Sequence, residues 1–144
     1  MKILINNKNA NRNYEVLEKF EAGLELFGTE VKSISHSNGS INEAYIIIEK
    51  GEAKILNMYV APFFEGNINN VDPYRTRKLL LHKREILKLD RIVQRERLTI
   101  VPLKIFWKNQ KLKISIALGK GKKLHDKRED LKKRDAMRQI KERI

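Results

Sequence analysis

The clearest pattern of apolar and polar positions lies in residues 111–118, where the two kinds alternate. Side chains of a β-strand point to opposite faces in turn, so this run predicts a strand with one apolar face. That face carries Leu112, Ile114, Ile116 and Leu118. Even spacing also predicts a strand over residues 14–26, and runs rich in β-branched and aromatic residues predict strands over 44–49, 53–61 and 98–107.

Turn and breaker residues separate these strands. Residues 50–52 predict a tight turn, so the runs on either side of it form a hairpin. Pro62 ends the second of those runs, and Pro102 predicts an edge or a bulge, because proline has no N–H for the ladder. Residues 108–110 predict a turn into the last strand. Residues 1–13 are rich in Asn and predict a turn or an extended arm.

Two helices are predicted. Over residues 76–93, apolar side chains recur every seven residues with a second set beside them, which gives one apolar helical face. That face carries Leu79, Leu80, Ile86, Leu87 and Val93. The polar face carries Lys83, Arg84, Lys88, Arg91 and Arg95. A shorter helix is predicted over residues 29–34 with Thr29 as its N-cap.

About six short strands with one long helix predict a small antiparallel β-barrel in residues 1–118. Residues 119–144 differ in composition and form a separate basic tail, which opens with a flexible Gly- and Lys-rich stretch. Asp126 and Glu129 have the spacing of a capping box, yet the helix they would open has few apolar residues. Our hypothesis is that the tail is largely disordered alone and becomes helical on an anionic surface. The alternative is a helix that docks on its own barrel.

The charge is unevenly distributed along the 144 residues. The net charge is +13, and residues 1–74 carry 7 basic and 10 acidic side chains whereas residues 75–144 carry 24 and 8. This asymmetry favours a polyanionic partner over a merely solvated surface, and an anionic membrane is a weaker alternative. No apolar run approaches the roughly 18 residues of a transmembrane helix. We expect a soluble intracellular protein.

Residues with catalytic or metal-binding chemistry are few. There are no cysteines, and the three histidines are far apart in sequence, so the chain has no familiar metal-ligand spacing. Glu21, Glu25 and Glu30 form an acidic cluster that we expect to pair with the basic half or to contact bases and riboses; metal binding or acid–base catalysis is the alternative. Phe106 and Trp107 are neighbours on a strand, so one of them points outward and is a candidate for base stacking.

Three segments of the chain resemble the SsrA-binding protein (SmpB) family. They are residues 20–33 (FEAGLELFGTEVKS), 72–85 (DPYRTRKLLLHKRE) and 119–128 (GKGKKLHDKR). The blocks are long, and the match is colinear from about residue 7 to residue 128, which is nearly the whole chain.

The resemblance implies a bacterial trans-translation factor. Such a factor binds the tRNA-like domain of transfer-messenger RNA (tmRNA) and brings it, charged with alanine and carried by elongation factor Tu, to stalled ribosomes. The implied body is a six-stranded antiparallel β-barrel of oligonucleotide-binding (OB) type with about three helices. The implied tail is flexible when free and helical in the vacant mRNA channel near the decoding centre. We therefore expect a cytoplasmic, monomeric RNA-binding adaptor that is not an enzyme and needs no cofactor.

The resemblance also assigns residues by position. Those expected to bind RNA are Asn7, Lys8, Glu21, Lys32, Arg75, Arg77, Lys78, Leu80, Lys83 and Arg84. Those of the tail expected to contact the ribosome are Lys120, Lys122, Lys123, His125, Asp126, Lys127 and Arg128. Lys and Arg would neutralise phosphates and Glu21 would accept from a 2′-hydroxyl or a base amine. Leu80 has an alternative role as a core residue that supports its basic neighbours.

The chain departs from the family pattern at four positions. Arg12 and Asn13 stand where a His and an acidic residue are usual, Ser35 replaces an Arg, and Ser37 replaces a Gly. Two other functions remain open from the residues alone. One is a general ribosomal or RNA-chaperone barrel that binds many RNAs alike, and the other is an RNA-processing enzyme that uses Glu21 and Glu25 with a metal.

Overall fold

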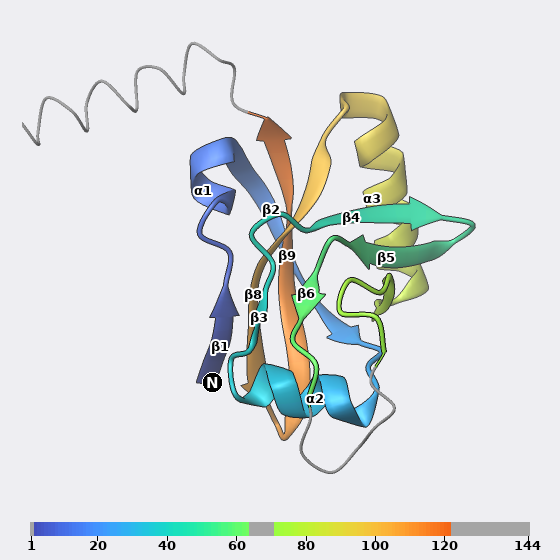
Figure 1. Cartoon of the computed structure of the whole chain (residues 1–144). Helices are drawn as coiled ribbons and strands as arrows, with labels where there is room; N and C mark the ends of the chain where they lie inside the picture. Colours follow the sequence, from blue (N-terminus) through green and yellow to red (C-terminus); the bar gives the residue numbers. More distant parts are fainter. Residues whose placement is uncertain (1, 64–70, 122–144) are drawn as a thin grey trace, which may run out of the picture.

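The protein is described by a computed structural model that covers residues 2–63 and 71–121 (Figure 1). Its elements in chain order are β1 (Lys2–Asn6), α1 (Ala10–Asn13), β2 (Tyr14–Leu24), α2 (Gly28–Ser35), β3 (Gly39–Ser40), β4 (Tyr45–Glu49), β5 (Glu52–Leu56), β6 (Tyr59–Val60), β7 (Arg77–Leu80), α3 (Lys83–Glu96), β8 (Thr99–Lys108) and β9 (Lys111–Gly121). The predicted fold class, mainly β with about three helices, is confirmed for this part of the chain.

The strand pairings close a ring. The large sheet has the order β1-β8-β4-β5-β7-β2-β9, and β8 also pairs with β9, so that the path from β8 through β4, β5, β7 and β2 returns along β9. All of these pairs are antiparallel. β1 pairs with the second half of β8, and β3 pairs with β6 as a separate two-stranded sheet. Closure of the ring leaves few unpaired strand edges.

Two hairpins follow from their turn residues. Lys50 and Gly51 join β4 to β5 with φ values of 52° and 75°. Asn109 and Gln110 join β8 to β9 with φ values of 50° and 63°. Two successive residues at positive φ give the hairpin turn whose twist matches that of the strands. The hairpin predicted around residues 50–52 is confirmed, although its second strand ends at Leu56 and β6 is a separate strand.

The bulge predicted at Pro102 is confirmed, because the β8–β9 register shifts between Pro102 and Lys104. The predicted alternation in β9 is also confirmed. Ile114, Ile116 and Leu118 are almost fully buried and lie in the core with residues of every large-sheet strand. In the same core lies Leu89 of α3, which is fully buried.

The helix predicted over residues 76–93 is wrong in its first half. Residues Arg77–Leu80 form β7, and α3 begins only at Lys83 after His82. In β7 burial alternates, with Leu79 at 1% exposure and Leu80 at 52%. β7 pairs with β5 on one side and β2 on the other. Pairing with these two strands decides the structure of residues 77–80 against the helix that their apolar spacing predicted. The seven-residue spacing runs by chance from β7 into α3.

The N-terminal segment and α2 also differ from expectation. Residues 2–6 are more than an arm, since they pair with β8, and Leu4 and Ile5 are buried. α2 begins one residue before Thr29, and its first turn is capped by the Glu30 carboxylate, which accepts from the backbone N–H of Phe27 at 2.9 Å.

β9 continues to Gly121, three residues past its expected end at Leu118. Gly119 lies against Tyr14 of β2, and a Cβ atom at Gly119 would stand 3.0 Å from the Tyr14 Cβ. The glycine therefore allows the close approach of the two strands, and residues 119–121, which we predicted as the start of a flexible stretch, belong to β9.

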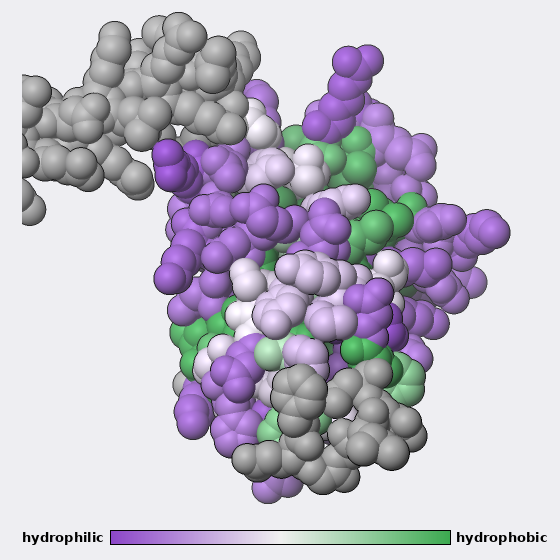
Figure 2. Space-filling model, in the orientation of Figure 1, coloured by the Kyte–Doolittle hydropathy of each residue, from purple (hydrophilic) through white to green (hydrophobic). Residues whose placement is uncertain are grey.

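Figure 2 shows hydrophilic residues over much of the face seen there, with smaller apolar areas between them. Among the helices of the described ranges, none is long and apolar enough to cross a membrane.

Candidate nucleic-acid interface

An apolar groove of about 390 Å³ opens between β2, β7 and the β8–β9 hairpin. Leu80, Trp107 and Leu112 line it together with the cations Lys111 and Lys113. Leu80 points outward because its neighbour Leu79 occupies the core, and Leu80 rests on Gly23, where an added Cβ would be 3.2 Å from the Leu80 Cβ. The alternative of Leu80 as a core residue is therefore wrong.

Trp107 is the outward member of the Phe106–Trp107 pair. Phe106 is 2% exposed, whereas Trp107 is half-buried and lines the groove. Alternation along a strand had limited the choice to these two residues, and the structure decides it. An indole face beside a leucine and two lysines can bind a base or ribose while the cations contact phosphates.

Glu21 lies in β2 two residues before Gly23 and is exposed. Its carboxylate accepts from Lys108 Nζ at 3.1 Å and 3.3 Å. Lys108 belongs to the β8–β9 hairpin, so this ion pair joins β2 to the hairpin at the groove. No sequence pattern pointed to Lys108, because the two partners are 87 residues apart.

Metal binding by the acidic cluster gains no support from the geometry. In residues 2–63 and 71–121, no three His, Cys, Asp or Glu side chains are grouped as metal ligands. Glu30 instead forms ion pairs inside the protein, 2.6 Å from Arg77 Nε and 2.7 Å from Arg75 Nη2.

The Glu30–Arg77 pair is almost completely buried, with both side chains at most 2% exposed. Arg77 also donates to the backbone carbonyls of Met58, Arg75 and Pro73. Burial by itself would raise the pKa of Glu30, but hydrogen bonds from Arg75, the Phe27 amide and Arg77 outweigh it and hold the pKa below its ordinary value. Burial lowers the pKa of Arg77 although Glu30 opposes this effect.

Arg77 therefore does not belong to the cationic surface on which we expected it. The N–H groups of its guanidinium form hydrogen bonds inside the protein, among them the one to Glu30 that holds β7 against α2. The sequence of a segment rich in Arg and Lys does not show which of its charged side chains is buried. Only the alternation of side chains along β7 distinguishes the buried Arg77 from its exposed neighbour Lys78.

Two further predicted RNA-binding residues lie on the α2 side of the molecule. The Arg75 guanidinium stacks on the Phe27 ring at 4.7 Å, and Lys32 Nζ lies 5.5 Å from the Phe63 ring centroid. Lys32 is exposed, and Arg75 retains 27% exposure of its side chain.

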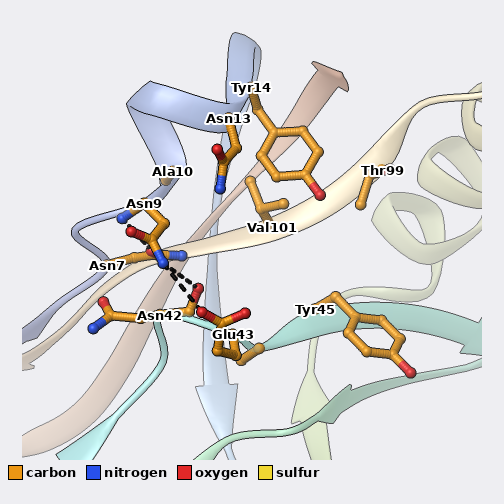
Figure 3. Close-up of a pocket in the computed structure, with 11 residues that line it drawn as sticks. Asn7, Asn9, Ala10, Asn13, Tyr14, Asn42, Glu43, Tyr45, Thr99 and Val101 are labelled. Atoms are coloured by element: carbon orange, nitrogen blue, oxygen red, sulfur yellow. Dashed lines mark hydrogen bonds between the residues drawn. The ribbon is translucent and has the colours of Figure 1, made fainter. Parts of the chain in front are cut away.

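Asn7 lines a different hollow of about 180 Å³, and its chain neighbour Lys8 is exposed (Figure 3). Asn7 donates from Nδ2 to the Pro102 carbonyl at 2.7 Å and accepts from the Asn9 amide at 2.9 Å. The Lys8 amide donates to the Asn42 side chain at 2.8 Å. Figure 3 shows Asn7, Asn9 and Asn13 along one wall and Tyr14 beside them. This hollow shares no lining residue with the groove.

The other predicted residues are placed as follows. Lys78 is exposed in β7, with its Nζ 3.6 Å from Glu52, and Lys83 and Arg84 are exposed in the first turn of α3. Lys120 is exposed near the end of β9. The remaining tail residues lie outside the described residues: Lys122, Lys123, His125, Asp126, Lys127 and Arg128.

Comparison with known families decides what kind of protein carries this surface. The sequence profile of the SmpB protein family matches residues 4–144. The chain belongs to the SmpB family. It is 65% identical over 137 residues to an SsrA-binding protein of Ureaplasma parvum, a match that covers 95% of this chain and 97% of the relative. It is 56% identical to an SsrA-binding protein of Malacoplasma penetrans over 100% of this chain and 99% of the relative.

The fold agrees with that of a solved SmpB. A chain from a solved structure of tmRNA-SmpB with the bacterial ribosome matches this chain with a TM-score of 0.69 and 42% sequence identity. The match covers 83% of this chain and 85% of that one. The family assigned from the three sequence blocks is thereby confirmed.

Proposed function

We propose that this SmpB-family chain is an RNA-binding adaptor of trans-translation. It binds the tRNA-like domain of tmRNA and delivers it to stalled ribosomes. Elongation factor Tu is reached only through alanyl-tmRNA. The chain acts as a cytoplasmic monomer and performs no catalytic step. Membership of the SmpB family along residues 4–144 is the observation that carries this proposal.

We further propose that the ring of strands is a six-stranded barrel of OB type. The closed path of antiparallel pairs supports this assignment, and OB barrels commonly bind nucleic acids on the strand face and adjoining loops. The groove is lined by residues of strands β2 and β7 of this ring and of the β8–β9 hairpin.

In this proposal the groove makes the principal contact with the tRNA-like domain. Leu80 and Trp107 cover a base or ribose, Lys111 and Lys113 contact phosphates, and Glu21 exchanges Lys108 for a 2′-hydroxyl. The other cations assigned by the resemblance contribute further phosphate contacts; they are Lys8, Lys32, Arg75, Lys78, Lys83 and Arg84. Asn7 acts by ordering the loop that presents Lys8, because its side chain is already bonded to Pro102 and Asn9.

The proposed role of the tail is separate. Residues 122–144, with Lys120 just before them, occupy the empty mRNA channel near the decoding centre. A general RNA-chaperone role remains the alternative function, because the same excess of positive charge would bind many RNAs alike.

A pair of leucine variants tests the groove. Leu80→Ala removes an exposed leucine from the groove, whereas Leu17→Ala removes a leucine of similar exposure (49% against 52%) from β2 outside it. We expect Leu80→Ala to weaken binding of the isolated tRNA-like domain about tenfold, the equivalent of one lost apolar side-chain contact, and Leu17→Ala to leave it unchanged. Fluorescence anisotropy with a labelled RNA measures both. Equal affinities for the two variants would contradict the groove as the contact, and equal binding of bulk tRNA by the wild type would favour the chaperone role.

A further inference from the structure

Helix α3 carries four cations in one row: Arg84, Lys88, Arg91 and Arg95. At 3.6 residues per turn these positions fall within about 60° of arc, and at 1.5 Å per residue they extend over about 16 Å. All four residues are exposed. The opposite side of the helix holds Leu89, which is fully buried in the core.

The row is poorly neutralised. Lys88 Nζ is 2.8 Å from Glu18, and Arg95 is 3.4 Å from its neighbour Glu96 in an exposed pair. Arg84 and Arg91 form no ion pair with any residue in the described ranges. Like charges three and four residues apart on a helix destabilise it. The row therefore costs helix stability, which an anionic partner would offset.

The acidic residues of α3 lie off the row. Glu85 caps the helix by accepting from the His82 amide at 3.2 Å, and Asp90 accepts from Gln94 at 3.0 Å. Asp90 and Gln94 line a hollow between α3 and β4 instead of the solvent-facing row. An approaching phosphate strand would meet no carboxylate of α3 between Arg84 and Arg95.

The position of the row links two parts of the molecule. Its first residue, Arg84, follows β7 by four positions and so starts near Leu80 of the groove. Its far end leads into β8, where Thr99 pairs with Gly119 of β9. Helix α3, which carries the row, thus runs from the end of β7 toward the end of the ring at which β9 finishes (Figure 1).

We propose that this row is a second RNA-contacting surface, which binds the sugar–phosphate backbone of the tRNA-like domain beyond the groove. The inference rests on the proposed function and adds Lys88, Arg91 and Arg95 to it. Guanidinium groups bind phosphate oxygens in bidentate fashion, and three of the four cations are arginines. A straight row of cations matches the regular spacing of phosphates along an RNA strand. It matches a compact acidic patch on a protein less well. Lys88 would exchange Glu18 for a phosphate on binding.

The test uses the full chain with Arg91→Gln and Arg95→Gln combined. The matched control is Lys2→Gln with Lys50→Gln, which removes the same charge from exposed positions in β1 and the β4–β5 turn. Affinity for the isolated tRNA-like domain is measured across a salt series, and circular dichroism checks that both proteins are folded. We expect about tenfold weaker binding at low salt and a log Kd against log salt slope shallower by about 1 to 2 for the α3 variant, with the control unchanged.

A charge-preserving variant completes the design. Arg91→Lys with Arg95→Lys should retain most of the salt slope, since lysine keeps the phosphate contact. Equal slopes for the α3 variant and the wild type would overturn the proposal, as would equal losses in the α3 variant and the control. The proposal would also be overturned if the α3 variant lost affinity only for the ribosome or for an acidic protein and kept its affinity for the tRNA-like domain. If the wild type failed to prefer tmRNA over bulk tRNA, the proposed function would fail instead.

Discussion

At the residue scale, the buried pair of Glu30 and Arg77 joins α2 to β7. Its two charges are compensated by one another and by Arg75, the Phe27 amide and three backbone carbonyls. Removal of one partner of such a pair leaves an unpaired buried charge and typically costs about 3–5 kcal/mol. Arg77 is thus a stability residue that positions Arg75 and Lys78 on either side of it.

Glu30→Gln should lower the free energy of unfolding at neutral pH by about 3 kcal/mol and also change its pH dependence. The folded pKa of Glu30 lies below its ordinary value of 4.5, so the pair stabilises the protein fully above that pH. As the pH falls below it, the unfolded chain binds the proton first, and this stability is lost toward the folded pKa. Urea unfolding at several pH values measures both effects, with Glu49→Gln at an exposed position as control. Parallel acid profiles for wild type and Glu30→Gln would contradict the assignment.

Ser37 follows the C-cap of α2 with φ of 60°, the left-handed conformation that a glycine adopts most readily. Its amide donates to the Ile34 carbonyl at 2.9 Å, so the conformation closes the helix end. Ser37→Gly should therefore raise the free energy of unfolding by about 1 kcal/mol through relief of the left-handed cost. Thermal unfolding measures the change, and a lowered melting temperature would show that Ser37 is unstrained. This position is one of the four departures from the family pattern.

At the element scale, the pairing of the last residues of β9 with β2 depends on Gly119. A Cβ there would stand 3.0 Å from the Tyr14 Cβ, which is tied to the backbone and cannot swing away, whereas a Cβ at Gly121 meets nothing within 4 Å. Gly119→Ala should cost about 1–3 kcal/mol of stability and Gly121→Ala under about 0.5 kcal/mol. Chemical denaturation of the two variants is the comparison. Equal stabilities would mean that β9 does not approach β2 this closely.

The same scale shows what the sequence could predict. Strand alternation identified the buried face of β9, and turn residues placed both hairpins, because these signals are local. The boundary between β7 and α3 was missed, because the pairing of β7 with β5 and β2 is a long-range effect. The apolar residues of β7 also continue the seven-residue spacing of the apolar residues in α3. The burial of Arg77 and the Glu21–Lys108 pair also depend on contacts between distant segments. The groove residue Trp107 was half-predicted, as one of two neighbours.

At the scale of the whole molecule, the positive charge divides between body and tail. Residues 75–118 carry 13 basic and 3 acidic side chains, and residues 119–144 carry 11 and 5. The first set includes the buried Arg77, the cations Lys111 and Lys113 of the groove and the cations of α3, and we assign its exposed members to tmRNA. The second lies almost wholly in the tail, which we assign to the ribosome. Because β9 ends at Gly121, a chain that stops there keeps every described strand.

The most direct test of this account is a competition measurement on the chain shortened to end at Gly121. The labelled tRNA-like domain of tmRNA is displaced by unlabelled bulk tRNA, and the ratio of the two affinities is compared with that of the full chain. We predict that the shortened chain retains both its affinity for the tRNA-like domain, within a few-fold, and its preference for it over bulk tRNA. Loss of the preference on removal of residues 122–144 would contradict the assignment of tmRNA recognition to the body.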